Sequence, residues 1–178
     1  MERLKTYGMF FLVVATLLLA VGCTNAEENG ASADESENSA EENTQTVLEH
    51  IFTGPGEEHE DLFSSDAQTK GERLSEYYRE NFKPYMSDRF YEGFVNSNGA
   101  LMFLQQAHPN YKLEPEEIAL EEDKGDYGFT VTLAYMNTEN EKTETMEIKG
   151  KADTNEEGEL TSINYINAEQ FLEELNEK

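Results

Sequence analysis

The sequence has 178 residues and is strongly acidic, with 38 Asp and Glu against 13 Lys and Arg and a net charge of −25. A surface of this sign repels nucleic acid, whose binding needs Lys and Arg on the phosphates, and it is also repelled by anionic lipid headgroups. The single Cys excludes an internal disulfide and a cysteine-rich metal site. The composition therefore excludes a nucleic-acid partner.

An apolar segment lies near the N-terminus. Residues 9–23 read MFFLVVATLLLAVGC and follow two cations, Arg3 and Lys5. A basic flank, a short apolar core and small residues at its end are typical of a secretory signal. A retained transmembrane helix is the alternative, although a span needs about 20 apolar residues and this run stops at Gly22. We expect residues 1–22 to be a signal peptide.

The end of this segment indicates the type of signal. Ala20-Val21-Gly22-Cys23 resembles the lipobox of bacterial lipoproteins, although that family most often has Leu where Ala20 stands. The resemblance implies cleavage before Cys23, diacylglycerol on its thiol and further acylation, for instance with palmitate, of the new N-terminus. It also implies that the lipid on Cys23 anchors the chain to the outer face of the cytoplasmic membrane. The alternative is an ordinary signal that happens to end at a thiol.

The next segment, Thr24–Thr46, contains seven carboxylates, no cation and no aromatic residue. Low hydrophobicity with charge of one sign does not bury enough apolar area to fold. We therefore predict that residues 23–46 are a lipidated Cys followed by a disordered acidic stalk. The remaining residues, 47–178, are predicted to form a single domain.

The first half of this domain has the spacing of helices. Apolar residues recur at three- and four-residue steps in Val47–Phe52, Leu74–Tyr85, Phe90–Val95 and Ala100–Ala107. Glu57–Ser64 is expected to form a further turn or two. Pro and Gly residues separate these segments.

The second half alternates apolar and polar residues, which is typical of strands. The alternation is clearest in Tyr127–Tyr135, and it recurs in Met146–Ala152 and Leu160–Asn167. A weaker strand is expected in Tyr111–Leu120, and a short closing helix in Ala168–Asn176. Helices followed by an antiparallel meander predict an α+β fold.

The order of these elements, together with the aromatic stretch Tyr77–Val95, resembles the nuclear-transport-factor-2-like (NTF2-like, or cystatin-like) superfamily. The resemblance implies N-terminal helices packed on a curved antiparallel sheet, a cone that can hold a pocket. Some members are isomerases, dehydratases or hydrolases, and many are exported domains without catalysis. The fold by itself does not select a function.

The best strand supplies the candidate pocket lining, which is apolar and aromatic. These side chains share one face of the strand: Tyr127, Phe129, Val131, Leu133 and Tyr135. None is a carboxylate or His, so the pattern favours core packing over proton transfer. Asp126, Glu147 and Asp153 lie near strands, but the pattern does not place them inside a pocket.

Two patterns could bind a metal. His50 and His59 flank a Gly-Pro-Gly break among acidic residues, and imidazole with carboxylate suits transition metals. Asp153-x-Asn155-x-Glu157-Gly158 resembles the start of a calcium loop, but Asn164 stands where the closing Glu belongs. A solvated face for the first pattern and a hairpin turn for the second are the favoured explanations. We expect no metal and no cofactor.

These observations predict a lipid-anchored extracytoplasmic protein whose domain is not an enzyme and binds an unidentified protein or envelope component. The alternative is a pocket that binds a small apolar molecule. A pocket enzyme of the isomerase or hydrolase type is a further alternative, and it would require a buried Asp, Glu or His with a perturbed pKa in that pocket.

Overall fold

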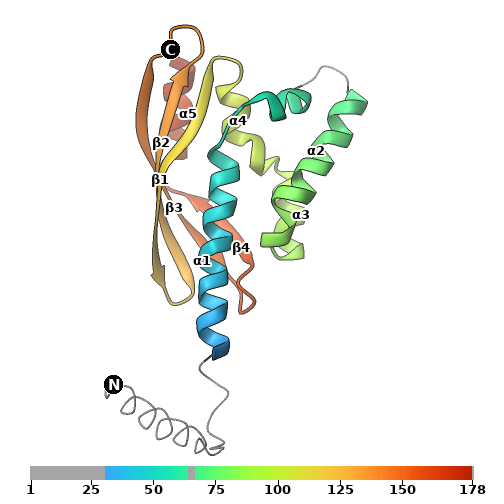
Figure 1. The fold of residues 1–178 in the computed structure, drawn as a ribbon, viewed down its shortest axis with the longest axis vertical. Coiled ribbons are helices and arrows are strands. Elements are labelled where there is room, and N and C mark those ends of the chain that lie inside the picture. Colours follow the sequence, from blue (N-terminus) through green and yellow to red (C-terminus); the bar gives the residue numbers. More distant parts are fainter. Residues whose placement is uncertain (1–30, 64–66, 178) are drawn as a thin grey trace, which may run out of the picture.

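The computed structural model describes residues 31–63 and 67–177. Helices come first and strands second (Figure 1). The elements in chain order are α1 (Ala31–Phe52), η1 (Glu57–Phe63), α2 (Ala67–Asn81), η2 (Lys83–Tyr85), α3 (Asp88–Asn96), η3 (Gly99–Leu101), α4 (Met102–Ala107), β1 (Tyr111–Asp123), β2 (Asp126–Asn137), β3 (Thr143–Thr154), β4 (Leu160–Tyr165) and α5 (Ala168–Glu177). The predicted α+β arrangement is confirmed.

The four strands form one antiparallel sheet in the order β1-β2-β3-β4. Each strand pairs with the next along the chain, so the sheet is a meander. The alternation of side chains in β2 and β3 is the pattern that predicted them, since one face of each strand is buried. β1 and β4 are the edge strands, and Pro115 lies at a register shift in β1, where a missing N–H is tolerated.

Helix α1 begins at Ala31, so the predicted disordered stalk is wrong over residues 31–46. Ala40 and Thr44 are buried and extend the stripe of Val47 and Leu48 by two turns. The Thr44 hydroxyl donates to the Ala40 carbonyl at 2.7 Å, which allows a polar residue on this buried face. The ordered domain therefore starts well before residue 47, and residues 23–30 lie outside the described part of the chain.

Contacts with the far end of the chain also hold α1. The Asn43 amide donates to the Gly158 carbonyl in the turn between β3 and β4, at 2.9 Å. Gly158 has a φ of +77°, a conformation that glycine adopts without strain. The stretch that composition alone indicates to be unfolded thus docks on a hairpin more than a hundred residues away.

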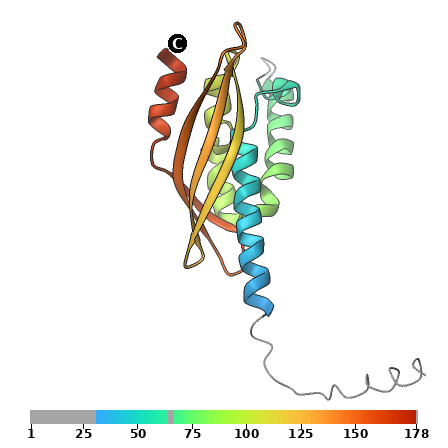
Figure 2. The ribbon, with the colours of Figure 1, turned by 60° about the vertical axis from the view of Figure 1, so that its left-hand side comes forward.

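The core lies between the inner face of the sheet and the helices. Figure 2 shows α1 along the sheet with α2 further out. The five side chains of β2 that were expected to line a pocket are all buried, at 4 % exposure or less: Tyr127, Phe129, Val131, Leu133 and Tyr135. Phe171 of α5 contacts the rings of Phe103 on α4 and Tyr135 on β2, so the closing helix completes the core.

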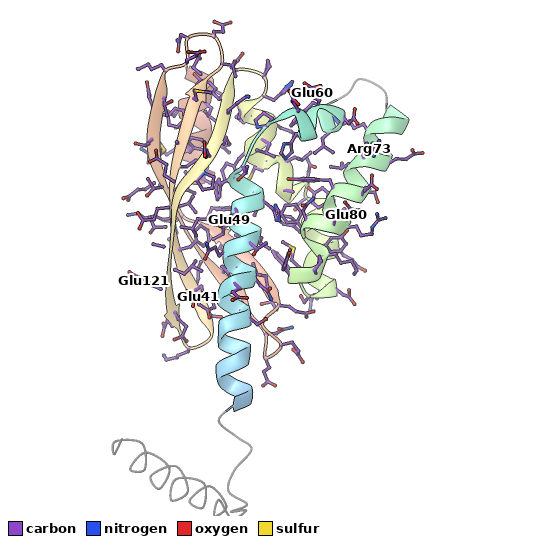
Figure 3. All side chains as sticks on the ribbon, in the orientation of Figure 1. Glu41, Glu49, Glu60, Arg73, Glu80 and Glu121 are labelled. Atoms are coloured by element: carbon purple, nitrogen blue, oxygen red, sulfur yellow. The ribbon has the colours of Figure 1, made fainter. Side chains whose placement is uncertain are left out.

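The acidic residues lie on the outside, spread over helices and sheet. Figure 3 labels Glu41, Glu49, Glu60, Glu80 and Glu121, all of which are exposed. Within the described ranges, no helix is both long and apolar enough to span a bilayer. The apolar segment before Cys23 and Cys23 itself are outside these ranges.

Candidate functional site

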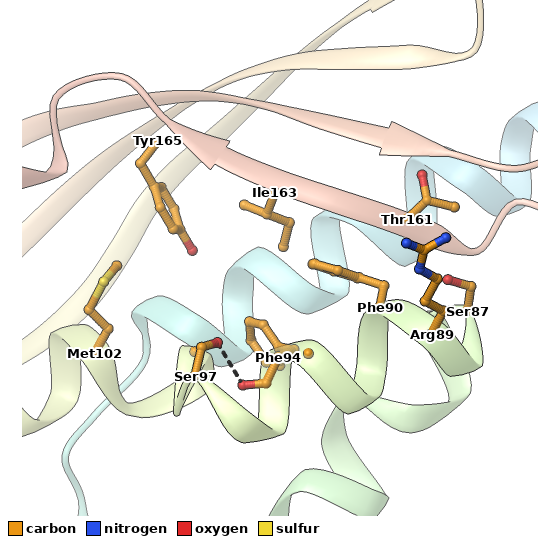
Figure 4. Close-up of a pocket in the computed structure, with 11 residues that line it drawn as sticks. Ser87, Arg89, Phe90, Phe94, Ser97, Met102, Thr161, Ile163 and Tyr165 are labelled. Atoms are coloured by element: carbon orange, nitrogen blue, oxygen red, sulfur yellow. Dashed lines mark hydrogen bonds between the residues drawn. The ribbon is translucent and has the colours of Figure 1, made fainter.

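A cavity of about 700 Å³ lies between helix α3 and the edge strand β4. Its walls are mainly apolar, as Figure 4 shows. The residues that line it are Ser87, Arg89, Phe90, Gly93, Phe94, Ser97, Gly99, Met102, Thr161, Ile163 and Tyr165. This volume falls within the range of small-molecule sites.

The cavity exists because α3 and β4 are joined at one end only. The Ser87 N–H donates to the Leu160 carbonyl at 3.0 Å, and Met86 forms a bridge with the same residue. Beyond this junction, Ile163 and Tyr165 of β4 face α3 without pairing to it (Figure 4). Side chains stand roughly perpendicular to a sheet, so Ile163 and Tyr165 form one wall of an open groove.

The helix wall of the cavity is fixed by aromatic packing. Phe94 of α3 contacts the rings of Tyr78 and Phe82, with centroids 5.8 and 5.2 Å apart. Its ring also covers Gly99, where an added Cβ would lie 2.4 Å from a ring carbon. Gly93, by contrast, has no atom within 4 Å of a Cβ built on it, so its place on the wall faces open space.

Tyr165 is the unusual group of this site. Its ring is contacted by Phe52, Phe103 and Phe129, with centroids 5.2 to 6.2 Å apart. Its hydroxyl is shielded from water and has no hydrogen-bond partner among the described residues. Burial alone raises the pKa of this hydroxyl, so it stays protonated.

An unpartnered buried hydroxyl costs about 1–3 kcal/mol of folding free energy. Figure 4 shows the Tyr165 hydroxyl directed toward α3, between Met102 and Ile163. Methionine side chains are unbranched and adaptable. Met102 therefore forms an adaptable part of the cavity wall on the side of this hydroxyl.

Arg89 lies at the other end of the cavity. Figure 4 shows its guanidinium beside Ser87 and Thr161, away from Tyr165. The lining contains no Asp, Glu or His, so Arg89 is its only charged group. The arrangement can bind and orient a molecule through apolar contact, one hydroxyl and one cation.

The two histidines near the Gly-Pro-Gly break have structural roles. His59 is buried, and its Nδ1 accepts the Gly56 N–H at 3.2 Å. Its ring fills the space beside Gly54, where an added Cβ would lie 2.8 Å away. Burial lowers the pKa of His50, which opposes a charged imidazole at neutral pH. Within residues 31–63 and 67–177, no three His, Cys, Asp or Glu side chains gather closely enough to hold a metal.

The acidic segment at Asp153 is a hairpin turn. The Asn155 side-chain oxygen accepts the N–H groups of Glu157 and Glu159 at 3.1 and 2.8 Å, so it is used within the turn. The Ser162 hydroxyl donates to Asp153 at 2.6 Å and, as the largest cause, lowers the pKa of that carboxyl.

The acids near the strands also lie outside the cavity. Lys151 pairs with Asp126 at 2.8 Å and with Asp153 at 3.1 Å. Lys149 pairs with Glu147 at 2.8 Å. None of the three carboxylates lines the cavity.

The five residues of β2 that were named as a possible pocket lining are buried in the core, as the pattern favoured, and none of them lines this cavity. The walls of the cavity come instead from α3, η3, α4 and β4. Phe90 and Phe94 were expected on an inner helix face, and Ile163 and Tyr165 on a strand. No sequence signal indicated that these two segments leave a space between them.

Comparison with known proteins gives one similarity. No protein-family model matches the sequence, and no curated protein matches it. A search of solved structures finds the crystal structure of a "putative polyketide cyclase" from Xanthomonas campestris pv. campestris. The two chains are 10% identical with a TM-score of 0.45, over 79% of this chain and 98% of that one.

This finding contradicts one prediction of the sequence analysis. The chain was expected not to be an enzyme, whereas the similar structure carries the name of one. We withdraw that expectation.

Proposed function

We propose that this domain binds a small, mainly apolar molecule in the cavity between α3 and β4. The observation that carries the proposal is the Tyr165 hydroxyl, which is buried at an apolar cavity without a partner. Folded proteins pair nearly all buried polar groups, and exceptions call for an explanation. A ligand that offers a carbonyl or another acceptor supplies the missing partner.

We also propose that the domain is an NTF2-like cone and that the chain is a lipoprotein of the outer face of the cytoplasmic membrane. A long helix followed by a four-stranded antiparallel meander supports the first proposal. The lipobox-like sequence at Cys23 supports the second. A protein or envelope partner stays a prediction, because no described contact bears on it.

Gly93→Leu should weaken binding, because the new side chain occupies part of the cavity at its α3 wall. A suitable probe is 6-acetyl-2-naphthamide, a neutral naphthalene that carries a carbonyl acceptor. Equilibrium dialysis against the whole chain in phosphatidylcholine nanodiscs should show one saturable site, and the variant should lose at least about tenfold in affinity. The fold should tolerate the change, because leucine gains up to about 1 kcal/mol over glycine inside a helix.

Gly71→Leu is the matched control for this variant. Gly71 is in α2, is exposed, and also has no atom within 4 Å of an added Cβ. It should therefore gain the same helix propensity and bind the probe like the wild type. Equal binding by the wild type and Gly93→Leu, or no saturable binding to the wild type, would contradict the proposed function.

Tyr165→Phe should raise stability and weaken binding at the same time. Removal of an unsatisfied hydroxyl should raise the free energy of unfolding by about 1–2 kcal/mol in the free protein. The loss of one hydrogen bond to the acceptor should weaken probe binding about fivefold. Urea denaturation and dialysis measure the two effects.

Tyr78→Phe is the control, and it should change the free energy of unfolding in the opposite direction. The Tyr78 hydroxyl accepts the Ala100 N–H at 3.1 Å and donates to Asn98 at 3.3 Å, so its removal leaves a buried N–H unpaired. Burial, the largest cause, raises the pKa of Tyr78 to about 12. This variant should lose about 1–2 kcal/mol. A Tyr165→Phe variant that loses stability as Tyr78→Phe does would show that the Tyr165 hydroxyl has a partner inside the protein.

A further inference from the structure

We propose that the molecule bound between α3 and β4 carries a carboxylate, which pairs with Arg89. This inference rests on the proposed function, because it assigns the charge of the ligand for that same cavity. Three observations carry it: the charge of the cavity, the lack of a partner for Arg89, and the position of Arg89 relative to Tyr165.

The cavity is free of carboxylates in a chain that carries 38 of them. Three other cavities in the described part of the chain all contain acids. The acids that line them are Asp61, Glu76 and Glu80 in the first, Glu49, Glu114, Glu116 and Glu117 in the second, and Glu57 and Glu60 in the third. Arg73 lines the first of them and Lys112 the other two, but acids outnumber this cation in each. The cavity between α3 and β4 is the one of these four in which a cation has no acid beside it in the lining, so an anion is favoured there.

Arg89 makes no ion pair with any residue of the described ranges, although acids outnumber cations almost threefold. Arg73 and Arg79 both pair with carboxylates, at 3.0 and 3.5 Å. Asp88, the acid next to Arg89, is held by Lys83 at 2.8 Å, which lowers the pKa of Asp88. Arg89 is thus left available at the cavity.

The surroundings of Arg89 suit a carboxylate. A guanidinium donates two parallel hydrogen bonds to the two oxygens of this group. The hydroxyl of Ser87 lies beside it in Figure 4 and can donate to the same oxygens. The Thr161 hydroxyl already donates to the Asp153 carbonyl, at 3.1 Å. Tyr165 lies at the opposite end, beyond the apolar side chains of Phe90 and Ile163. A ligand with a carboxylate at one end and a carbonyl at the other offers each of these two polar groups a partner.

The test compares 6-acetyl-2-naphthoate with 6-acetyl-2-naphthamide, two probes of nearly equal shape that differ in charge. Dialysis against the whole chain in phosphatidylcholine nanodiscs, at pH 7.5 and 0.15 M salt, should show about fivefold tighter binding of the carboxylate. Gly93→Leu chain in equal amount serves as the blank for partition into lipid. Because the net charge of the chain is −25, non-specific binding elsewhere on its surface would favour the neutral amide over the carboxylate.

Arg89→Gln should abolish the preference, so that the variant binds the two probes with equal affinity. Arg79→Gln changes the net charge equally but lies outside the cavity lining, so it should keep the preference. Equal or tighter binding of the amide by the wild type, or a loss of preference in both variants, overturns the inference and leaves the proposed function standing. Failure of both probes to bind the wild type above the Gly93→Leu blank overturns the proposed function and the inference together.

Discussion

Gly150→Ala should lower the free energy of unfolding by about 3 kcal/mol, at the upper end of the usual cost of overpacking. Gly150 is buried in β3, and a Cβ there would lie 2.2 Å from a ring carbon of Phe129. It would also lie 2.5 Å from the carbonyl oxygen of Asn164 in β4. A flexible side chain could move away, but a strand carbonyl can move only with its strand.

Urea denaturation of wild type and variant measures this effect, and the melting temperature should fall by roughly 10 °C. Gly128→Ala is the matched control, because an added Cβ there meets only the Glu121 carbonyl, at 3.7 Å. The control should change the free energy of unfolding by less than about 0.5 kcal/mol. A Gly150→Ala variant as stable as Gly128→Ala would show that the sheet can yield at this point.

The same glycine explains why β2 lines no pocket at its centre. Phe129 is the cross-strand partner of Gly150, and its ring occupies the space that a side chain on β3 would take. From there it contacts the ring of Tyr165, the next partner of Gly150 across the sheet. Because Gly150 has no side chain, the Phe129 ring fills this part of the inner face of the sheet. It also packs against Tyr165, which forms one end of the cavity.

Periodicity predicted the strands and most helices because burial on one face is a local property. β2 extends the predicted Tyr127–Tyr135 by only one or two residues at each end. The start of α1 was missed because Ala40 and Thr44 are not recognised as a buried stripe by hydrophobicity. They are buried because Asn43, which lies between them in the helix, bonds to the turn before β4. A contact with a residue so far along the chain cannot be recognised from the local sequence.

The cavity could not be predicted for a related reason. Whether a side chain such as Ile163 lines a cavity or packs in the core depends on its distance from the element opposite, here α3. That distance depends on the single junction of Ser87 with Leu160. Gly93 and Arg89 have the pattern of exposed helix positions, and only the position of β4 across from them gives them a role.

Cys23→Ala should abolish lipid attachment completely, the largest effect expected for any single substitution in this chain. Acyl chains contribute about 0.8 kcal/mol for each buried CH₂, and stable anchoring takes two signals, such as two acyl chains or one chain with a polybasic patch. A surface with a net charge of −25 adds no electrostatic attraction to anionic lipid. In the proposed lipoprotein, attachment to the membrane therefore depends on the lipid on Cys23.

Cells fed an alkyne fatty acid should incorporate it into the wild-type chain and not into Cys23→Ala, and mass spectrometry should find residues 1–22 removed only from the wild type. Thr24→Ala, at the neighbouring position, should be labelled and processed normally. A high-salt wash should leave the wild type on membranes, because its attachment is apolar. An unlabelled wild-type chain, or equal labelling of Cys23→Ala, would remove the anchor and with it the proposed location of the cavity at a membrane surface.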